Sequence, residues 1–428
     1  MTGDSRGDPT FRVSVRRTVK GRGHVAAGAS GTDRDWSSDY DIFDPAFVQD
    51  PYPIWTALRD GVPLARTERW GGSWMPTRYE DIQTIAHDTA RFSSQQILVA
   101  PMPPVPGRQG QPRRSIIGSD APHHAPERRI VLPFFTPQAV ARYADHTAEL
   151  CHRFIDAFDD ADQVDAAAGY ARQLPPRIIA AILGVDPERA DEFVSWVQGF
   201  LEFGLTDPVA RDESRARIDA FIAEQIADRR EHPGADLISW LLGQQIEGAP
   251  LGLDIVEANI SLMLIAGIDT TWSSIGSALW HLATHPEDTA RLVADPELVP
   301  TAVEELLRAY SPVTMARIVT EETTFGGRTL HQGDRVLLPF AAANRDPAVF
   351  ERPDEVVIDR AHNRHIAFGS GVHRCAGSNL ARMEMVTALR VWLERIPRFH
   401  LADPDAVTWA GGQVRGPRHL PVVIDGRR

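Results

Sequence analysis

The chain has 428 residues, 43% of them hydrophobic and 8% aromatic, which is enough apolar material for a large buried core. Its formal net charge of −13 argues against nucleic acid as a partner, and its two cysteines exclude a disulfide scaffold and suit a reducing compartment. No apolar stretch reaches the ~20 residues of a membrane-spanning helix, and no signal core stands at the N-terminus, so we expect a cytoplasmic protein without a membrane span.

The first 35 residues differ in composition from the rest of the chain. They are rich in Gly, Ser, Asp and Arg, include the basic run RRTVKGRG at 16–23, and show neither helical nor strand periodicity. We expect a disordered leader over 1–35, which is either a solvated tail or a basic docking arm. Composition is even from Trp36 onward, so we expect a single domain over 36–428.

Local patterns predict the elements of the first half of the chain. Proline near the start and glycine at the end predict a short helix over 51–61. Five prolines in the segment 92–118 predict a long irregular loop. Apolar residues at helical spacing predict helices over 138–158, around 188–203 and over 211–231. Cys151 lies on the first of these patterns and is expected to be a buried, unreactive thiol.

The second half is predicted to be helical as well, with a few strands. The run 251–285 contains no proline and is apolar nearly all round, which predicts a long buried central helix. A further helix is expected over about 297–310, and strands are expected at 333–340 and after residue 397. The expected fold class is therefore mainly α with a small β lobe.

The other cysteine, Cys375, stands in the glycine-rich stretch AFGSGVHRCAG at 367–377. A helical pattern follows, so a thiolate at this position would lie at a helix N-terminus, which favours an anion. From the residues alone, three interpretations stay open. Cys375 could be a metal ligand, a nucleophile with His373 as its base, or part of an ordinary structural loop.

The stretch FGSGVHRCAG matches F-x-x-G-x-x-x-C-x-G and resembles the haem-binding loop of the cytochrome P-450 superfamily. The resemblance extends over about 36–428. It implies the fold of that family, with haem b (iron protoporphyrin IX) between the long central helix and the cysteine loop. It also implies that Cys375 is the axial thiolate ligand of the iron and that Phe368 and Gly377 contact the cofactor.

AGIDTT at 266–271 resembles the oxygen-activation motif A-G-x-[DE]-T of the same superfamily. The resemblance implies that Asp269 and Thr270 help to deliver protons, and that the small Ala266 and Gly267 leave room for haem and dioxygen. The alternative is that the Thr270 hydroxyl only bonds back to its own helix backbone. A carboxylate inside a buried helix is costly unless it is used or paired.

EELLR at 304–308 contains the superfamily pattern E-x-x-R in Glu305 and Arg308. The two residues are three positions apart and share a helix face. The resemblance implies that they form a buried structural network with Arg360, at the end of the segment 345–360. The alternative for an isolated pair is a weak ion pair on the surface.

Four further residues resemble the groups that bind the haem propionates in the family. His124 and Arg128 stand in SDAPHHAPERRIVLPFFTP at 119–137 with the spacing H-x-x-x-R, and Arg317 follows the E-x-x-R helix. His373 matches the histidine of the cysteine loop. Together they would supply hydrogen-bond donors to two carboxylates.

The resemblance implies a monooxygenase that inserts one oxygen atom of dioxygen into a small hydrophobic organic substrate, by hydroxylation or oxidative dealkylation. Neither a flavin nor an iron–sulfur domain follows the cysteine loop. Electrons are therefore expected from a separate ferredoxin and ferredoxin reductase, or from a fused reductase absent from this chain. Two other classes stay open, a peroxide-driven haem enzyme and a haem sensor without turnover. Peroxide-driven members usually lack the Asp269–Thr270 pair, and a sensor needs no proton relay.

The substrate itself is predicted only loosely. AGIDTTWSSIGSALWHLATHPED with LRAYSPVTMAR is similar to bacterial members that dealkylate thiocarbamates and aromatic ethers. The competing prediction is a hydroxylase of a terpene or polyketide. Candidate pocket residues are the loop 93–118, Met263, Val313, Thr314 and Met315. For the methionines, plain core packing is the alternative.

Overall fold

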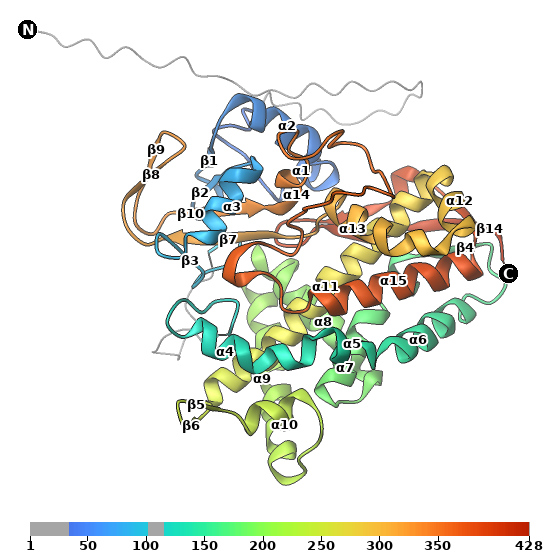
Figure 1. The fold of residues 1–428 in the computed structure, drawn as a ribbon, viewed down its shortest axis with the longest axis horizontal. Helices are drawn as coiled ribbons and strands as arrows, with labels where there is room; N and C mark the ends of the chain where they lie inside the picture. The colour runs from blue at the N-terminus through green and yellow to red at the C-terminus, as the bar shows by residue number, and fades with distance from the viewer. Residues whose placement is uncertain (1–33, 102–114, 428) are drawn as a thin grey trace, which may run out of the picture.

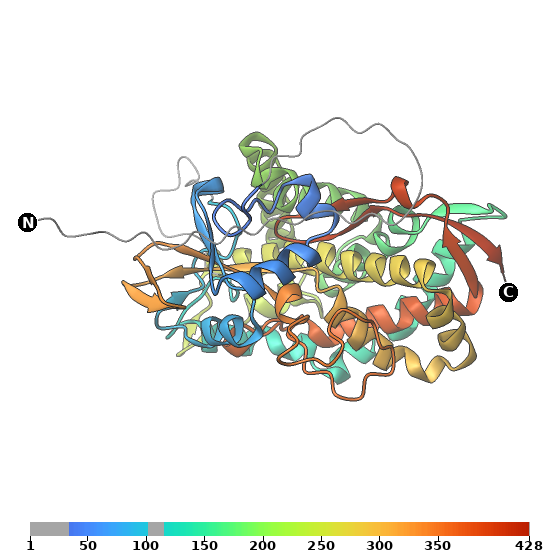
Figure 2. The same cartoon turned by 90° about the horizontal axis from the view of Figure 1, so that it is seen from above.

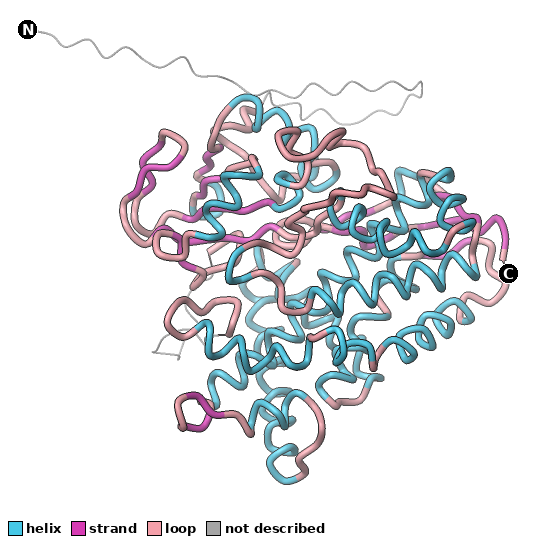
Figure 3. Tube along the Cα trace, viewed as in Figure 1, coloured by secondary structure: helices cyan, strands magenta, loops and turns pink. Residues whose placement is uncertain are grey.

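The computed structural model describes residues 34–101 and 115–427. The predicted leader over 1–35 therefore lies almost entirely outside the described residues, and the predicted loop over 92–118 lies partly outside them. The described residues are mainly helical, and the strands lie in separate small groups, with the largest sheet at the upper left of Figure 1 and a three-stranded sheet beside the C-terminus at its right (Figure 1, Figure 3). This arrangement confirms the predicted class, mainly α with a small β portion.

The helices contain nearly half of the described residues, and several predicted ones are confirmed. Their bounds are α1 Pro45–Gln49, α2 Tyr52–Gly61, α3 Tyr79–His87, α4 His124–Val131, α5 Pro137–Ala141, α6 Ala144–Asp156, α7 Leu174–Leu183, α8 Ala190–Leu201, α9 Pro208–Glu231, α10 Leu237–Leu242, α11 Leu253–Thr284, α12 Pro286–Ala294, α13 Val299–Ala309, α14 Phe340–Ala343 and α15 Ser378–Arg395. None of the described helices has the length and apolar character needed to cross a membrane.

The predicted helix over 138–158 is wrong in one respect, because the structure has two helices there. Thr136 caps α5 by accepting a hydrogen bond from the Ala139 N–H, and the chain turns before α6 begins at Ala144. Both helices pack on α15, and the turn between them allows each to do so. Cys151 lies in α6 and is fully buried, as predicted, and burial raises the pKa of its thiol to about 12.

The strands in the described ranges are short and form five sheets. Their bounds are β1 Ala65–Thr67, β2 Ser73–Met75, β3 Phe92–Ser93, β4 Gln163–Asp165, β5 Gln245–Ile246, β6 Ala249–Pro250, β7 Thr314–Val319, β8 Thr323–Phe325, β9 Arg328–Leu330, β10 Arg335–Pro339, β11 Arg398–Leu401, β12 Thr408–Ala410, β13 Gly416–His419 and β14 Pro421–Gly426. The largest sheet has the order β1-β2-β10-β7-β3, with β2 and β10 parallel and the other pairs antiparallel.

The longest helix, α11, runs through the centre of the molecule (Figure 2). Its 32 residues span about 48 Å at 1.5 Å per residue. It ends just before Pro286, because proline lacks the N–H that would continue the helix and clashes with the preceding turn. Helix α15 lies beside it in both views (Figure 1, Figure 2) and contacts it.

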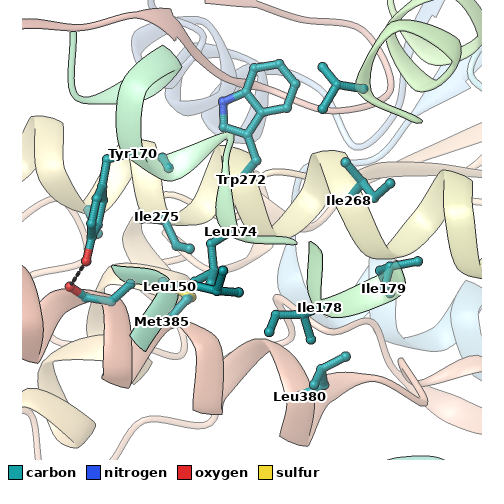
Figure 4. Packing of buried hydrophobic residues seen from close by; sticks show 14 of the residues in the cluster. Leu150, Tyr170, Leu174, Ile178, Ile179, Ile268, Trp272, Ile275, Leu380 and Met385 are labelled. Atoms are coloured by element: carbon teal, nitrogen blue, oxygen red, sulfur yellow. Dashed lines mark hydrogen bonds between the residues drawn. The ribbon is translucent and has the colours of Figure 1, made fainter. Parts of the chain in front are cut away.

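The main core forms where α6, α7, α11 and α15 meet. Figure 4 shows Ile178 of α7, Trp272 of α11 and Leu380 of α15 among the packed side chains, all almost fully buried. Burying one such side chain contributes roughly 1.5–3 kcal/mol. The Tyr170 hydroxyl donates to the Ala388 carbonyl at 2.8 Å, which satisfies this buried polar group and ties it to α15. The core fixes α11 relative to the segment that precedes α15.

Candidate active site

A cavity of about 400 Å³ lies between α11 and the glycine-rich loop that contains Cys375. Its walls are mostly apolar and come from α7, α8, α9, α11, the start of β7 and the segments around residues 97 and 116. The predicted site residues that line it are Arg128, Met263, Ala266, Gly267, Thr270, Val313, Met315, Arg317, Phe368, His373, Cys375 and Gly377. The predicted residues His124, Asp269 and Thr314 are not part of its lining.

The loop before α15 directs Cys375 into this cavity. Gly369 and Gly371 have φ values of 74° and 71°, a left-handed conformation that favours glycine. The Cys375 N–H donates to the Phe368 carbonyl at 2.8 Å, which closes the loop. Helix α15 begins at Ser378, with Gly377 as its N-cap. The thiol therefore lies just before a helix N-terminus, close to the predicted position.

The surroundings of Cys375 act on its thiol in opposite directions. Its side chain is open to the cavity, but protein encloses it on the other sides, and this desolvation raises its pKa. The Gly377 N–H and the guanidinium of Arg128 lower the pKa, because both stabilise a thiolate. A cation bound in the cavity would favour the same thiolate form.

Buried hydrogen-bond donors without full partners surround the cavity near Cys375. The rings of His124 and His373 lie 4.2 Å apart, and Arg317 is only 3% exposed. Nε2 of His124, both ring nitrogens of His373 and Nε of Arg317 have no hydrogen-bond partner among the described residues. Burying such groups without partners is costly. The site therefore suits a ligand that brings anionic acceptors.

The pKa values of these groups reflect the same environment. Burial, followed by the charges of Arg317, His124 and Arg128, lowers the pKa of His373 to about 3, while the Ile116 backbone acts in the opposite direction. Burial lowers the pKa of Arg317 to about 10. An apolar cavity with these donors on its rim and a thiol at Cys375 fits iron protoporphyrin IX, which has an apolar ring, two carboxylates and a metal that binds thiolate.

Asp269 is buried in α11 and is paired with an arginine that the sequence did not predict. Its carboxylate lies 2.8 Å from Nη2 of Arg418 in β13 and accepts a hydrogen bond from the Ser273 hydroxyl at 3.1 Å. Arg418 also binds Glu202 at 2.8 Å and stacks on the ring of Trp272. Burial raises the pKa of Asp269, and Arg418 opposes this shift.

Thr270 lines the cavity, and its hydroxyl donates to the Ala266 carbonyl at 2.7 Å. The hydrogen bond from Thr270 to its own helix, which the sequence left as the alternative, is therefore present in this structure. The hydroxyl oxygen can still accept a hydrogen bond.

Gly267 is required to be small by the packing of α7 on α11, in addition to any space needed by haem and dioxygen. A Cβ atom at this position would lie 2.5 Å from Cδ1 of Ile179, so glycine allows α7 to approach α11.

Glu305 and Arg308 form a fully buried ion pair in α13, away from the cavity lining. Nε and Nη2 of Arg308 bind the two Glu305 oxygens, each at 2.8 Å, and Arg360 binds the same carboxylate at 2.9 Å. The Val357 N–H and the Asn363 side chain complete the set of donors to Glu305. Burial opposes the shift, but these donors lower the pKa of Glu305 overall. The contacts match the predicted network.

Comparison with known proteins identifies the family. A family model for cytochrome P450 matches residues 209–299 and 288–401. Mycinamicin IV hydroxylase/epoxidase of Micromonospora griseorubida is 34% identical over 86% of this chain and 94% of its own length. Nocardicin C N-oxygenase of Nocardia uniformis subsp. tsuyamanensis is 34% identical over 90% of this chain and 98% of its own length.

Solved structures agree with the sequence relatives. The Bacillus subtilis cytochrome P450 PksS of bacillaene polyketide synthase has a TM-score of 0.83 and 29% identity, covering 90% of this chain and 100% of that one. CYP109E1 from Bacillus megaterium, in complex with testosterone, has a TM-score of 0.81 and 27% identity, covering 88% and 98%. The chain therefore belongs to the cytochrome P450 family of haem-thiolate monooxygenases, whose cofactor is iron protoporphyrin IX.

Proposed function

We propose that this chain is a monooxygenase that inserts one atom of dioxygen into a hydrophobic organic substrate bound in the cavity beside Cys375, by hydroxylation or oxidative dealkylation. The observation that supports this proposal best is the composition of the cavity. It combines an apolar lining and a cysteine thiol at one end with His373 and Arg317 on its wall, and His124 lies against His373. Buried nitrogens of all three side chains have no hydrogen-bond partner among the described residues.

Each cofactor contact has a proposed residue. Cys375 would hold the iron through its thiolate, and Phe368 and Gly377, which line the same cavity, would pack against the porphyrin ring. Arg128 and Arg317, together with His124 and His373, would donate hydrogen bonds to the propionates. When bound, haem supplies the redox and oxygen chemistry, and the protein supplies orientation and protons.

Proton delivery is assigned to Asp269 and Thr270. Burial raises the pKa of Asp269, so its carboxylate can hold a proton under milder conditions than an exposed one. Thr270 lines the cavity, and its hydroxyl would orient a water molecule or the dioxygen that receives the proton. Arg418 and Glu202 connect Asp269 to the molecular surface, because the Glu202 side chain is 20% exposed.

The substrate is proposed to be an apolar secondary metabolite. Met263, Val313 and Met315 give the cavity apolar walls, which suits a hydrophobic compound of either predicted class. The names of the relatives, with mycinamicin IV, nocardicin C and polyketide biosynthesis among them, favour a secondary-metabolite hydroxylase over a dealkylase of thiocarbamates or aromatic ethers.

Electrons are proposed to come from a separate ferredoxin and its reductase, or from a fused reductase that is absent from this chain. The surface beside Cys375 offers the exposed cations Arg129 and Arg374 and the exposed apolar side chains of Leu132 and Val372. An acidic partner with an apolar centre would complement this surface.

Carbon monoxide spectra and turnover test the proposal. The reduced protein with bound carbon monoxide should show the red-shifted Soret band of thiolate ligation, Cys375→Ala should lose it, and Cys151→Ala should retain it. Turnover with NADH and surrogate ferredoxin partners is expected to exceed turnover with hydrogen peroxide. Faster product formation with peroxide would favour the peroxide-driven alternative, and the absence of product with either would favour a sensor.

A further inference from the structure

Two described pieces of chain, 97–101 and 115–118, contribute Ile97, Leu98 and Ile116 to the cavity wall. Neither piece contains a helix or a paired strand of its own. Their backbone N–H groups therefore need acceptors from elsewhere, since an unpaired buried N–H is costly. Two buried side-chain amides supply acceptors, one to each piece.

Gln413, in the turn between β12 and β13, holds the first piece. Its Oε1 accepts from the Val99 N–H at 3.0 Å, and its Nε2 donates to the Thr314 carbonyl at 2.8 Å. The side chain is 4% exposed and lines the cavity. The Ala316 N–H also donates to the Ile97 carbonyl at 2.9 Å. Gln413 thus fastens the wall segment to the start of β7.

Asn259, in α11, holds the second piece with the same chemistry. Its Oδ1 accepts from the Ile116 N–H at 3.3 Å, and its Nδ2 donates to the Ile255 carbonyl at 2.8 Å. The side chain is 2% exposed. Because α11 is fixed by the main core, Asn259 places Ile116 at a set position on the cavity wall.

Both amides use their donors and acceptors on the protein itself. They are therefore poorly placed to recognise a substrate directly, and their effect is on the shape of the wall. We propose that Asn259 and Gln413 are positioning residues that determine which bulky apolar ligands the cavity accepts. This inference rests on the proposed function, because it takes the cavity to be the substrate site.

Azole binding to the haem-loaded, full-length protein tests the proposal. Gln413→Met and Asn259→Leu keep the side-chain size and remove the hydrogen bonds. Imidazole is small enough to reach iron without this wall, whereas clotrimazole must contact the walls. Titration of the Soret shift should leave the Kd for imidazole within about twofold, and should weaken clotrimazole binding about tenfold, as expected when a buried hydrogen bond loses its partner.

Hydrogen exchange gives a second readout that does not depend on the iron. The Val99 amide in Gln413→Met and the Ile116 amide in Asn259→Leu should each exchange about tenfold faster, since each loses its acceptor. Gln173→Met is the control. The Gln173 amide donates to the Ala168 carbonyl at 2.9 Å but does not line the cavity, so neither readout should change.

The outcomes separate the two proposals. For each variant, the ratio of the clotrimazole Kd to the imidazole Kd is compared with that of wild type. If this ratio stays within twofold in both variants, the role of Asn259 and Gln413 is overturned, while the proposed function is unaffected. A wild-type protein that binds neither azole would overturn the proposed function and this inference with it. If either variant does not fold, Gln413→Asn and Asn259→Ser, which keep a polar group but shorten its reach, give the same comparison.

Discussion

Asp269 is a buried carboxylate, and its ion pair with Arg418 lowers a pKa that burial raises. Arg418 contacts it at 2.8 Å and also binds Glu202, at the end of α8. Removing Arg418 would leave the Asp269 carboxylate without its cation, and its pKa would rise further. The ion pair with Arg418 therefore limits the rise in the pKa of Asp269, so that the carboxyl group can still ionise inside an apolar helix.

Thr270→Ala is expected to bind haem and substrate and to consume NADH, but with poor yield of product. Without the hydroxyl, protons are not placed correctly, and oxygen is lost as hydrogen peroxide or water. Product formed per NADH consumed is the measurement, with peroxide assayed alongside. Thr270→Ser keeps a hydroxyl and should retain the yield. Wild-type yield in Thr270→Ala would mean that the threonine only bonds to the Ala266 carbonyl.

Asp269→Asn is expected to slow the whole cycle rather than to lower the yield per NADH. The amide cannot ionise, so the group that exchanges protons with solvent through Arg418 and Glu202 is lost. General acid–base groups typically contribute about 10²–10⁴-fold, and kcat should fall within that range. A solvent isotope effect on kcat should increase as proton delivery becomes limiting. An unchanged kcat would remove Asp269 from the relay.

At the scale of elements, Glu305 joins α13 to the segment before the cysteine loop. Arg308 lies on the same helix, whereas Val357, Arg360 and Asn363 come from the segment. A buried carboxylate that receives this many donors fixes the two pieces of chain against each other.

Glu305→Ala is expected to abolish folded, haem-loaded protein. Losing one partner of a buried ion pair typically costs about 3–5 kcal/mol, a large part of the 5–15 kcal/mol that stabilises an ordinary domain. The yield of soluble protein with the thiolate Soret band measures this effect. Glu321→Ala, at an exposed position, is the control. Soluble, haem-replete Glu305→Ala protein would contradict the structural role.

Glu384 of α15 predicts a pH dependence of stability. It is fully buried, neither carboxylate oxygen has a hydrogen-bond partner in the described residues, and burial raises its pKa well above the ordinary value. The folded state therefore keeps the carboxyl neutral, while the unfolded chain ionises it above about pH 4.3. Folding then takes up a proton, so the stability contributed by this group falls as pH rises from about 4.3 toward the folded pKa.

Glu384→Gln should remove that dependence. The free energy of unfolding of the variant, relative to wild type, should increase between pH 5 and pH 8, with a limiting slope of about 1.4 kcal/mol per pH unit. Urea unfolding at both pH values measures it. Glu394→Gln, at an exposed position on the same helix, should show no such trend. A relative stability that does not change with pH would mean that Glu384 finds a partner for its charge.

Elements defined by local signals could be predicted closely. The run 251–285 predicted α11, whose bounds are Leu253–Thr284, because prolines mark both ends of the apolar pattern. The break between α5 and α6 could not be predicted, because both helices are placed by contact with α15, far along the chain. Short-range apolar periodicity does not contain that information.

The candidate site divides in the same way. The resemblance to the family implied that the central helix and the cysteine loop lie on either side of haem, and Thr270 and Cys375 do line one cavity. The partner of Asp269 could not be predicted, because Arg418 is 149 positions away and stands in no recognisable pattern. Gln413 and Val99 are 314 positions apart. Contacts of this kind depend on the tertiary fold.

At the scale of the whole molecule, the cofactor and the fold should stabilise each other. The cavity lies between α11 and the loop before α15, and near Cys375 it has buried donors that find no partner among the described residues. A ligand that binds only the folded state adds to its stability, and here it would also satisfy those donors. Thermal unfolding of the haem-loaded protein should therefore occur at a higher temperature than that of the haem-free protein.

His373→Phe should change the Tm in opposite directions in the haem-free and the haem-loaded protein. In the haem-free protein it replaces a ring with two unpartnered buried nitrogens by an apolar ring, so the Tm should rise. In the haem-loaded protein it removes a hydrogen bond to a propionate, so the Tm and the haem affinity should both fall. His331→Phe, at an exposed position, should leave both forms unchanged. A shift of the same sign in both forms would mean that His373 packs in the loop and does not bind the cofactor.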